Sequence, residues 1–278
     1  MANPVHASVH ALHVYPVKAL GGFAPPDTAI EPWGPAGDRR WLVTDAQGKA
    51  LTQREQPRLA LASSRALPGG AVRLIAPGLD PLDVPVPQPV GTDPVSLFGS
   101  KYEAVPAGQD ADAWLSGHLG VAARLMHLDD PAHRRPVDPE FARPGETVSF
   151  ADGFPLLVTT LASLDALNTL IAQGGTPGEG PLPMNRFRPN LVLDGTAPWA
   201  EDHWRRIVVG EVSFRVAKPC GRCIVTTTDQ HTAERGKEPL RTLARHRRSG
   251  TSLLFGQNLV PENTGVVRIG DPVTLHTS

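Results

Sequence analysis

Thiols are scarce in this sequence, because Cys220 and Cys223 are the only cysteines among its 278 residues. Two cysteines in so long a chain do not form the disulfide framework of a small secreted protein, and a reducing compartment suits a chemically active thiol better. No apolar run approaches the roughly 18 residues of a membrane span, and the start, MANPVHASVH, lacks the basic and apolar parts of a signal peptide. We therefore expect a cytoplasmic protein that is not inserted in a membrane.

An excess of charge of either sign is missing too. The chain has 27 Lys and Arg against 28 Asp and Glu, a net charge of −1. Because nothing attracts nucleic acid overall, we expect no nucleic-acid partner, and any anion site must be a local cluster of cations. The chain is rich instead in proline (29) and glycine (27), and so many helix breakers favour short strands over a helical bundle.

The pattern of apolar residues predicts a mainly β protein with some helices. Helices are expected at 110–120, at 238–248 and at 160–174, where Thr160 is the N-cap candidate. The proline-rich segment 129–146 has no periodicity and is predicted to be a long loop outside the core. Strands are expected at 7–20, 39–45, 49–55, 58–67, 71–77, 81–86, 121–128, 188–195, 205–218 and 266–275.

The Cys-x-x-Cys spacing leaves several chemistries open: a redox dithiol, half of a zinc site, a disulfide, or a frame for one metal-binding thiolate. A zinc ion would need histidines as further ligands, but on a strand His6 and His10 point to one side and His13 to the other. A thioredoxin-like dithiol begins a helix, whereas residues 223–228, CIVTTT, are predicted to be extended. Two small buried side chains remain a further alternative. Arg222 lies between the thiols, and a guanidinium beside a thiol favours the metal-binding thiolate.

Motifs along nearly the whole chain resemble a known family. They are VYPVKALGG near the start, DRRWLVTD, FRPNLVL, PCGRCIVTTTD, EPLRTLARHR, LFGQN and the closing GVVRIGDPVTL. In this order they resemble the molybdenum cofactor sulfurase C-terminal (MOSC) domain proteins that carry an N-terminal β-barrel domain. The resemblance is closest to the branch that contains the mitochondrial amidoxime reducing component and its bacterial relatives. It implies an α+β, mainly β fold, with an N-terminal barrel domain at residues 4–122 packed on a MOSC β-barrel domain at residues 123–278.

The resemblance also implies a set of site residues. Cys223 matches the position that gives a thiolate to molybdenum, and it is the implied catalytic residue. The chemistry agrees, because molybdopterin needs a soft ligand at its metal and cationic donors at its phosphate. Family members often carry hydroxyl residues where this chain has Ala19 and Gly153. The residues that match cofactor contacts are Lys18, Arg39, Asp152, Gly153, Arg188, Asn190, Gly221, Arg222 and Cys223.

The implied activity is a molybdenum-cofactor-dependent reduction of N-hydroxylated substrates to amines or amidines. Because the chain ends at Ser278 without a ferredoxin domain, we expect a separate electron donor of the ferredoxin, cytochrome or flavoprotein type. The same resemblance carries a family-level link to pyridoxal phosphate binding. One alternative is a carrier that passes on the molybdenum cofactor, or sulfur held as a cysteine persulfide. Another is a protein that binds a phosphate ligand without metal.

Overall fold

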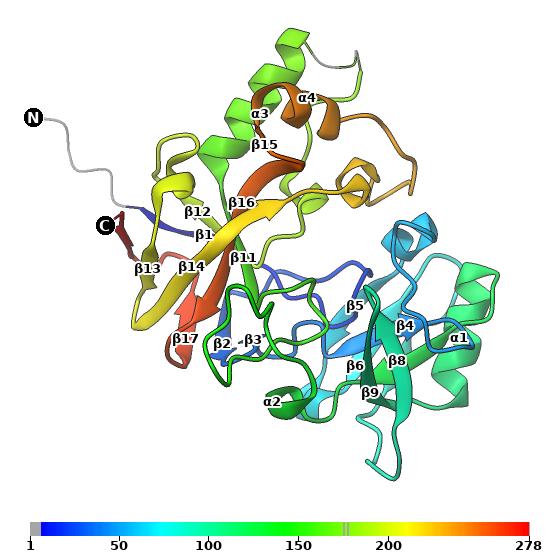
Figure 1. Ribbon diagram of the computed structural model, residues 1–278. Helices are drawn as coiled ribbons and strands as arrows, with labels where there is room; N and C mark the ends of the chain where they lie inside the picture. Colours follow the sequence, from blue (N-terminus) through cyan, green and yellow to red (C-terminus); the bar gives the residue numbers. More distant parts are fainter. Residues whose placement is uncertain (1–6, 175, 177, 278) are drawn as a thin grey trace, which may run out of the picture.

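The computed structural model describes residues 7–174, 176 and 178–277. The predicted domain start at residue 4 and His6 therefore lie outside the described residues. Figure 1 shows two β-rich lobes, with the larger one above and to the left of the smaller one. The prediction of a mainly β fold with a few helices is confirmed.

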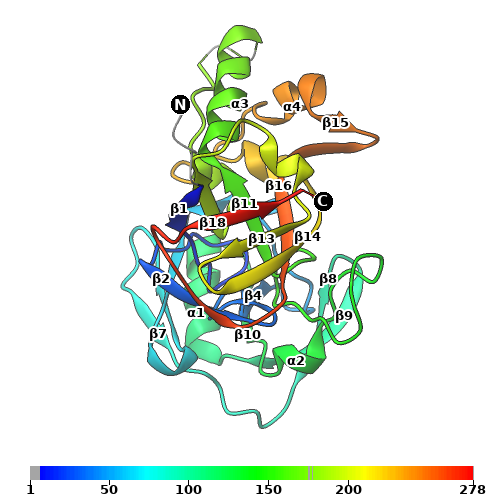
Figure 2. The same ribbon diagram turned by 90° about the vertical axis from the view of Figure 1, so that its left-hand side faces the viewer.

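The larger lobe is built on one eight-stranded sheet that nearly closes into a barrel. The first strand of this sheet contacts the turn that precedes its last strand. The Val9 N–H donates to the Asp271 carbonyl (3.0 Å), and the Gly270 N–H donates to the Val9 carbonyl (2.8 Å). Figure 2 shows three of its strands, β14, β13 and β18, side by side. The strand order is β1 (Ser8–Leu12), β12 (Leu191–Asp194), β11 (Leu156–Thr160), β16 (Ser252–Pro261), β14 (Val212–Gly221), β13 (Arg206–Val209) and β18 (Val273–His276), with β15 (Arg248–Ser249) paired to β16.

Two helices lie at the end of the larger lobe away from the smaller one: α3 (Leu161–Gly174) and α4 (Leu240–His246). The Thr160 hydroxyl accepts the Ser163 N–H at 3.1 Å, which confirms the predicted N-cap of α3. Since α3 carries the chain back across the sheet, β11 and β12 pair in parallel, whereas their other neighbours are antiparallel.

The smaller lobe has two sheets around its own core. Helix α1 (Gln109–Leu119) packs on this core, which confirms the helix predicted at 110–120 to within one residue. The helix is capped by Gly120 in the left-handed conformation. Trp41, Leu74 and Leu115 are buried together in this core. One sheet has the order β4 (Trp41–Thr44), β10 (Arg124–His127), β9 (Ser100–Pro106), β8 (Asp93–Leu97), and the other has the order β5 (Ser63–Ala66), β6 (Val72–Ile75), β7 (Leu82–Val84).

The two lobes exchange strands. β1 comes from the start of the chain and belongs to the larger sheet, while β10 follows the predicted boundary at residue 122 and pairs with β4 of the smaller lobe. A small third sheet pairs a late segment of the chain with early ones, in the order β17 (Gly265–Arg268), β2 (Asp27–Glu31), β3 (Gly34–Pro35). Segments far apart in the sequence thus meet between the lobes.

Four local predictions are wrong in whole or in part. The predicted strand at 49–55 is absent: Lys49 and Ala50 make isolated bridges, and the chain then turns, with the N–H groups of Glu55 and Gln56 both donating to the Thr52 carbonyl. The predicted strand at 58–67 begins as the 3₁₀ helix η1 (Pro57–Leu61), and only its second half is a strand. The segment 129–146 does enter the core: it contains α2 (Pro131–Arg134), and Val137 and Arg135 are buried. The fourth concerns residues 223–228 and is described with the site. Among the described residues no helix is long and apolar enough to cross a membrane.

Candidate active site

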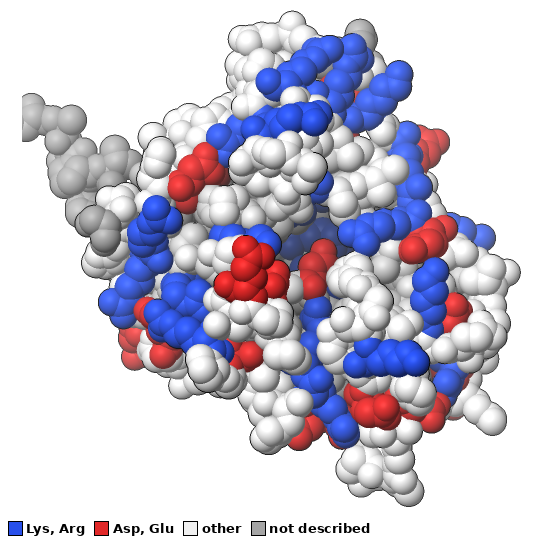
Figure 3. Space-filling view, in the orientation of Figure 1, with Lys and Arg blue, Asp and Glu red and all other residues white. Residues whose placement is uncertain are grey.

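A cleft of about 900 Å³, counted with its open mouth, lies between the lobes. Figure 3 shows this face, with Lys and Arg atoms inside the central hollow and around its rim. The smaller lobe contributes Ala19, Arg54 and Phe98 among others, and the larger lobe contributes both cysteines. All nine residues predicted to contact a cofactor line this cleft: Lys18, Arg39, Asp152, Gly153, Arg188, Asn190, Gly221, Arg222 and Cys223. Their individual roles stay predictions.

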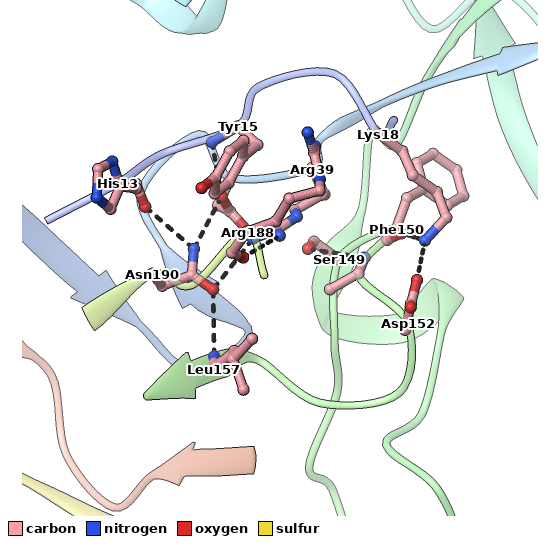
Figure 4. A network of polar contacts seen from close by, with 12 residues as sticks. His13, Tyr15, Lys18, Arg39, Ser149, Phe150, Asp152, Leu157, Arg188 and Asn190 are labelled. Atoms are coloured by element: carbon pink, nitrogen blue, oxygen red, sulfur yellow. Dashed lines mark hydrogen bonds and ion pairs between the residues drawn. The ribbon is translucent and has the colours of Figure 1, made fainter. Parts of the chain in front are cut away.

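Arg39 is held by a buried network at the back of the cleft (Figure 4). Its Nη1 donates to Asp38 Oδ2 at 2.6 Å and to Asn190 Oδ1 at 3.0 Å. The Asn190 amide also accepts the Leu157 N–H and donates to Asp38 Oδ1 and to the His13 carbonyl. Both its oxygen and its nitrogen are bonded to protein groups, so Asn190 positions Arg39.

Arg188 is the least satisfied cation of the cleft. Its guanidinium lies 4.3 Å from the centre of the Tyr15 ring, and that of Arg39 lies 4.4 Å from the same centre, so one buried ring positions both arginines. Arg188 Nη2 is buried and has no hydrogen-bond partner in the part of the chain that the structure describes. Burial lowers the pKa of Arg188 to about 10. A buried guanidinium without a carboxylate partner is suited to an anionic ligand.

Three residues that line the cleft have a left-handed backbone. Ala19, Arg39 and Arg188 all have positive φ values, of 72°, 47° and 52°. Left-handed conformations are uncommon outside glycine and are found preferentially at functional sites, where surrounding contacts hold them. Here the holding contacts are a hydrogen bond from Gln53 Nε2 to the Ala19 carbonyl (2.6 Å) and the network around Arg39.

Lys18 is buried on the other side of the cleft, and its Nζ donates to the Phe150 carbonyl at 2.8 Å and to Asp152 Oδ1 at 2.6 Å (Figure 4). Burial lowers the pKa of Lys18 to about 8, although the Asp152 carboxylate acts in the opposite direction. The Lys18 ammonium in turn holds the pKa of Asp152 well below its usual range. Arg135 supports this wall by donating to the carbonyls of Ser149, Ala151 and Asp152.

The two thiols are free, line the cleft and have different partners. β14 ends at Gly221 after a register shift, and Cys223 then precedes the 3₁₀ helix η5 (Ile224–Thr227). The prediction that CIVTTT is extended is therefore wrong, because the hydroxyls of Thr226 and Thr227 donate to the Cys223 and Ile224 carbonyls and stabilise the turn. Among the described residues, no three His, Cys, Asp or Glu side chains gather as a group that could hold a metal ion.

The guanidinium beside Cys223 is not the one that the sequence indicates. Arg222 Nη1 donates to Cys220 Sγ at 2.9 Å, whereas Arg54 Nη2 lies 3.4 Å from Cys223 Sγ. Arg54 belongs to the segment 49–55 that was predicted to be a strand, so no signal in the sequence pointed to it. Tyr15 and Asp38 were not among the predicted site residues, although they lie within the motifs VYPVKALGG and DRRWLVTD.

The two departures from the family motifs have different surroundings. A Cβ at Gly153 would meet nothing within 4 Å, so crowding does not require glycine there. Ala19 has its carbonyl bonded to Gln53, and a longer side chain at this position would start from the same left-handed backbone. Without hydroxyl groups at these two positions, backbone N–H groups or water would have to satisfy the facing ligand atoms.

Models of two domain families match the chain: the MOSC N-terminal beta barrel domain at residues 6–122 and the MOSC domain at residues 145–274. Over 288 residues the chain is 32% identical to mitochondrial amidoxime-reducing component 1 of Homo sapiens, which covers 96% of this chain and 82% of that protein. This chain belongs to the MOSC family. It is also 29% identical over 254 residues to molybdenum cofactor sulfurase of Danio rerio, covering 84% of this MOSC chain and 30% of that protein.

Among solved structures, the YUAD protein of Bacillus subtilis is 11% identical to this MOSC chain, with a TM-score of 0.45 over 98% of this chain and 96% of its own. The relatives that are amidoxime-reducing components and molybdenum cofactor sulfurases support a role related to the molybdenum cofactor.

The residues of the cleft fit such a cofactor. A molybdenum–pterin group presents a thiolate-binding metal and a phosphate. The MOSC chain offers the free thiol of Cys223 for the metal and the cations Lys18, Arg39 and Arg188 for the phosphate, all on one cleft. The unpartnered Nη2 of Arg188 is the feature that most directly calls for an anion.

We expect the affinity of the cleft for sulfate to fall as the pH rises through about 8, because Lys18 then loses its charge. Sulfate keeps its own charge over this range, so isothermal titration at a series of pH values reports on the protein. Lys18→Arg is the control, since a guanidinium stays protonated. An equal fall in this variant would contradict the assignment.

The same shift has a second consequence, for stability. Between about pH 8 and the ordinary lysine value, the unfolded chain binds this proton and the ligand-free folded protein does not. The contribution of Lys18 to the free energy of unfolding therefore rises with pH in this window.

Proposed function

We propose that this protein is an oxidoreductase that holds a molybdenum–molybdopterin cofactor in the cleft and reduces N-hydroxylated substrates to amines or amidines. The observation that carries the proposal is the convergence of a free thiol, Cys223, with the cations Lys18, Arg39 and Arg188 on one cleft. The similarity to amidoxime-reducing component 1 over most of both chains supports the same reaction class. A separate electron-donor protein, of the ferredoxin, cytochrome or flavoprotein type, would supply the electrons.

Each part of the cleft has a task in this proposal. Lys18, Arg39 and Arg188 would hold the phosphate, while Gly221 and Arg222 would contact the pterin and Cys223 would bind the metal. When bound, the cofactor supplies a two-electron couple that can accept the oxygen of an N–O bond. Three or more charge-assisted hydrogen bonds, each contributing about 1.5–3 kcal/mol, are sufficient to retain it without a covalent link.

The chain's own groups prepare this site before any ligand arrives. Asn190 and Asp38 fix the direction of Arg39, and the Tyr15 ring fixes the planes of Arg39 and Arg188. Since these groups are already ordered, binding an anion costs little side-chain entropy.

The test uses protein purified from a host that makes the cofactor. We expect stoichiometric molybdenum and pterin in this protein. With a chemical reductant it should convert benzamidoxime to benzamidine, and protein prepared without the cofactor should not. The amidine is measured by chromatography. A protein with full metal and pterin content that forms no amidine with any N-hydroxylated base would contradict the reductase.

A second candidate is a carrier of the cofactor, or of sulfur as a persulfide on Cys223. The similarity to molybdenum cofactor sulfurase and the open position of the thiol in the cleft favour it. Such a carrier would hand cofactor or sulfur to an acceptor apoenzyme and would not turn over benzamidoxime. The same loaded protein therefore distinguishes the two functions.

A further inference from the structure

A phenylalanine stands at the mouth of the cleft in a place where the backbone disfavours it. Phe98 and Gly99 are the two-residue loop of the β8–β9 hairpin, in which Leu97 pairs with Ser100. Both loop residues have positive φ, 53° for Phe98 and 86° for Gly99, which is the pattern of a type I′ turn. The first position of such a turn favours Asn or Asp, and a bulky side chain there is an outlier.

The side chain is also exposed. Phe98 is 49% exposed, yet it lines the cleft. Burial alone does not account for an aromatic ring at this tip, since half of its surface remains in water. A strained, exposed aromatic residue at a ligand site indicates a binding role.

The contacts of the ring place it close to the thiol. Arg54 Cζ lies 5.2 Å from the ring centre, and Arg54 Nη2 lies 3.4 Å from Cys223 Sγ. Lys18 Nζ lies 5.1 Å from the same ring centre. The ring, one guanidinium and the thiol therefore form a continuous wall on one side of the cleft.

The segment that carries Arg54 is fastened from the other lobe, so this wall has a defined shape. Arg235 donates to the carbonyls of Gln53 and Arg54, and the side-chain amides of Gln53 and Gln230 donate to each other at 3.1 Å in both directions. A substrate group that reaches Cys223 along this wall must pass over the face or edge of the Phe98 ring.

We propose that Phe98 is the floor of a substrate subsite that takes a flat, uncharged, aromatic substituent of the N-hydroxylated substrate. The inference rests on the proposed function, for which it names the substrate class. The aromatic substituent stacks on the exposed ring, and its N–O group points toward Cys223. The lining of the cleft has five cations, Lys18, Arg39, Arg54, Arg188 and Arg222, against the one carboxylate of Asp152, so substrates with a fixed positive charge are disfavoured.

The decisive variant is Phe98→Asn, because asparagine followed by Gly99 is a favoured type I′ pair. We expect it to fold with an unchanged or higher melting temperature. The KM for benzamidoxime should nevertheless rise about threefold to tenfold, the range that an aromatic pair contributes. The KM for acetamidoxime, which has no ring, should stay the same, and Phe98→Tyr should keep the wild-type preference for benzamidoxime.

Binding without turnover gives a second readout on the same proteins. Saturation-transfer NMR on the loaded, unreduced enzyme should show benzamidoxime binding to the wild type and weaker binding to Phe98→Asn. It should also show weaker binding of an analogue with a para-trimethylammonium group. Leu79→Asn is the matched control, since Leu79 is an exposed apolar residue outside the cleft, and it should change neither binding nor KM.

The outcomes distinguish a failure of the proposed function from a failure of the Phe98 subsite. If the loaded wild type reduces neither amidoxime, the proposed function fails. If it reduces both and Phe98→Asn keeps the wild-type ratio of their KM values, the function stands and the subsite is wrong. Equal binding of the cationic analogue would remove the charge selectivity from the proposal.

Discussion

Cys223→Ser is expected to abolish the reduction of N-hydroxylated substrates while leaving much of the pterin in place. The loss of rate should exceed a hundredfold, because even groups that only orient a metal ligand contribute about 10–100-fold. Lys18, Arg39 and Arg188 line the cleft independently of the thiol, so the phosphate keeps its partners. The measurements are amidine formation, and molybdenum and pterin content per protein chain.

Cys220→Ser is the matched control for this experiment, because Cys220 lies in the same cleft and its Sγ accepts a hydrogen bond from Arg222 at 2.9 Å. A serine oxygen can accept the same bond, so the rate should fall by no more than about tenfold, the value of one hydrogen bond. A dead Cys220→Ser variant with normal metal content, or an active Cys223→Ser variant, would require both thiols in the mechanism.

Arg39→Ala is expected to lower both cofactor content and stability, by about 3–5 kcal/mol in the free energy of unfolding. The reason is Asp38, which is 1% exposed and receives the Arg39 guanidinium at 2.6 Å. Without Arg39 this carboxylate keeps, among the described residues, the Tyr15 N–H and the Asn190 amide as hydrogen-bond donors, and a buried charge lacks its counter-ion. Urea unfolding followed by tryptophan fluorescence measures the stability change.

Combining Asp38→Asn with Arg39→Ala separates the two effects. The neutral amide at position 38 needs no counter-ion, so the double variant should regain a large part of the stability. Its cofactor content should stay low, because the cation is still missing. A double variant as unstable as Arg39→Ala would show that the lost stability comes from packing and not from the unpaired charge.

Much of the fold could be predicted because its signals are local. Helices α1, α3 and α4 were predicted from apolar spacing and end signals, and the hairpin of β13 and β14 from its alternation and turn. Strands β8, β9, β11 and β16, among others, received no prediction. β11 and β16 lie inside the larger sheet. β11 is buried along its whole length and therefore lacks the alternation that would mark a strand in a sequence.

The segment 49–55 shows why local pattern also misleads. Its position directly after the turn at 46–48 favours the second strand of a hairpin, but its backbone turns at Thr52 and is held by Arg235, which is 181 positions away from Arg54. The hydrogen bonds that decide its conformation thus come from the other lobe. Arg54, which this loop places beside Cys223, could therefore not be found from the sequence.

The sequence by itself determined which chemical groups are present and in what order: one pair of thiols, the cations in their motifs, and enough Pro and Gly to break the chain into short strands. Only the tertiary structure decided which of these groups meet. Arg54 lies beside Cys223, although the two residues are 169 positions apart, and Arg222 donates to Cys220. Arg39 donates to Asn190, whereas Arg188 has no hydrogen-bonding carboxylate among the described residues. The physical reason is that such contacts depend on the docking of two lobes, and short-range periodicity carries no information about distances between lobes.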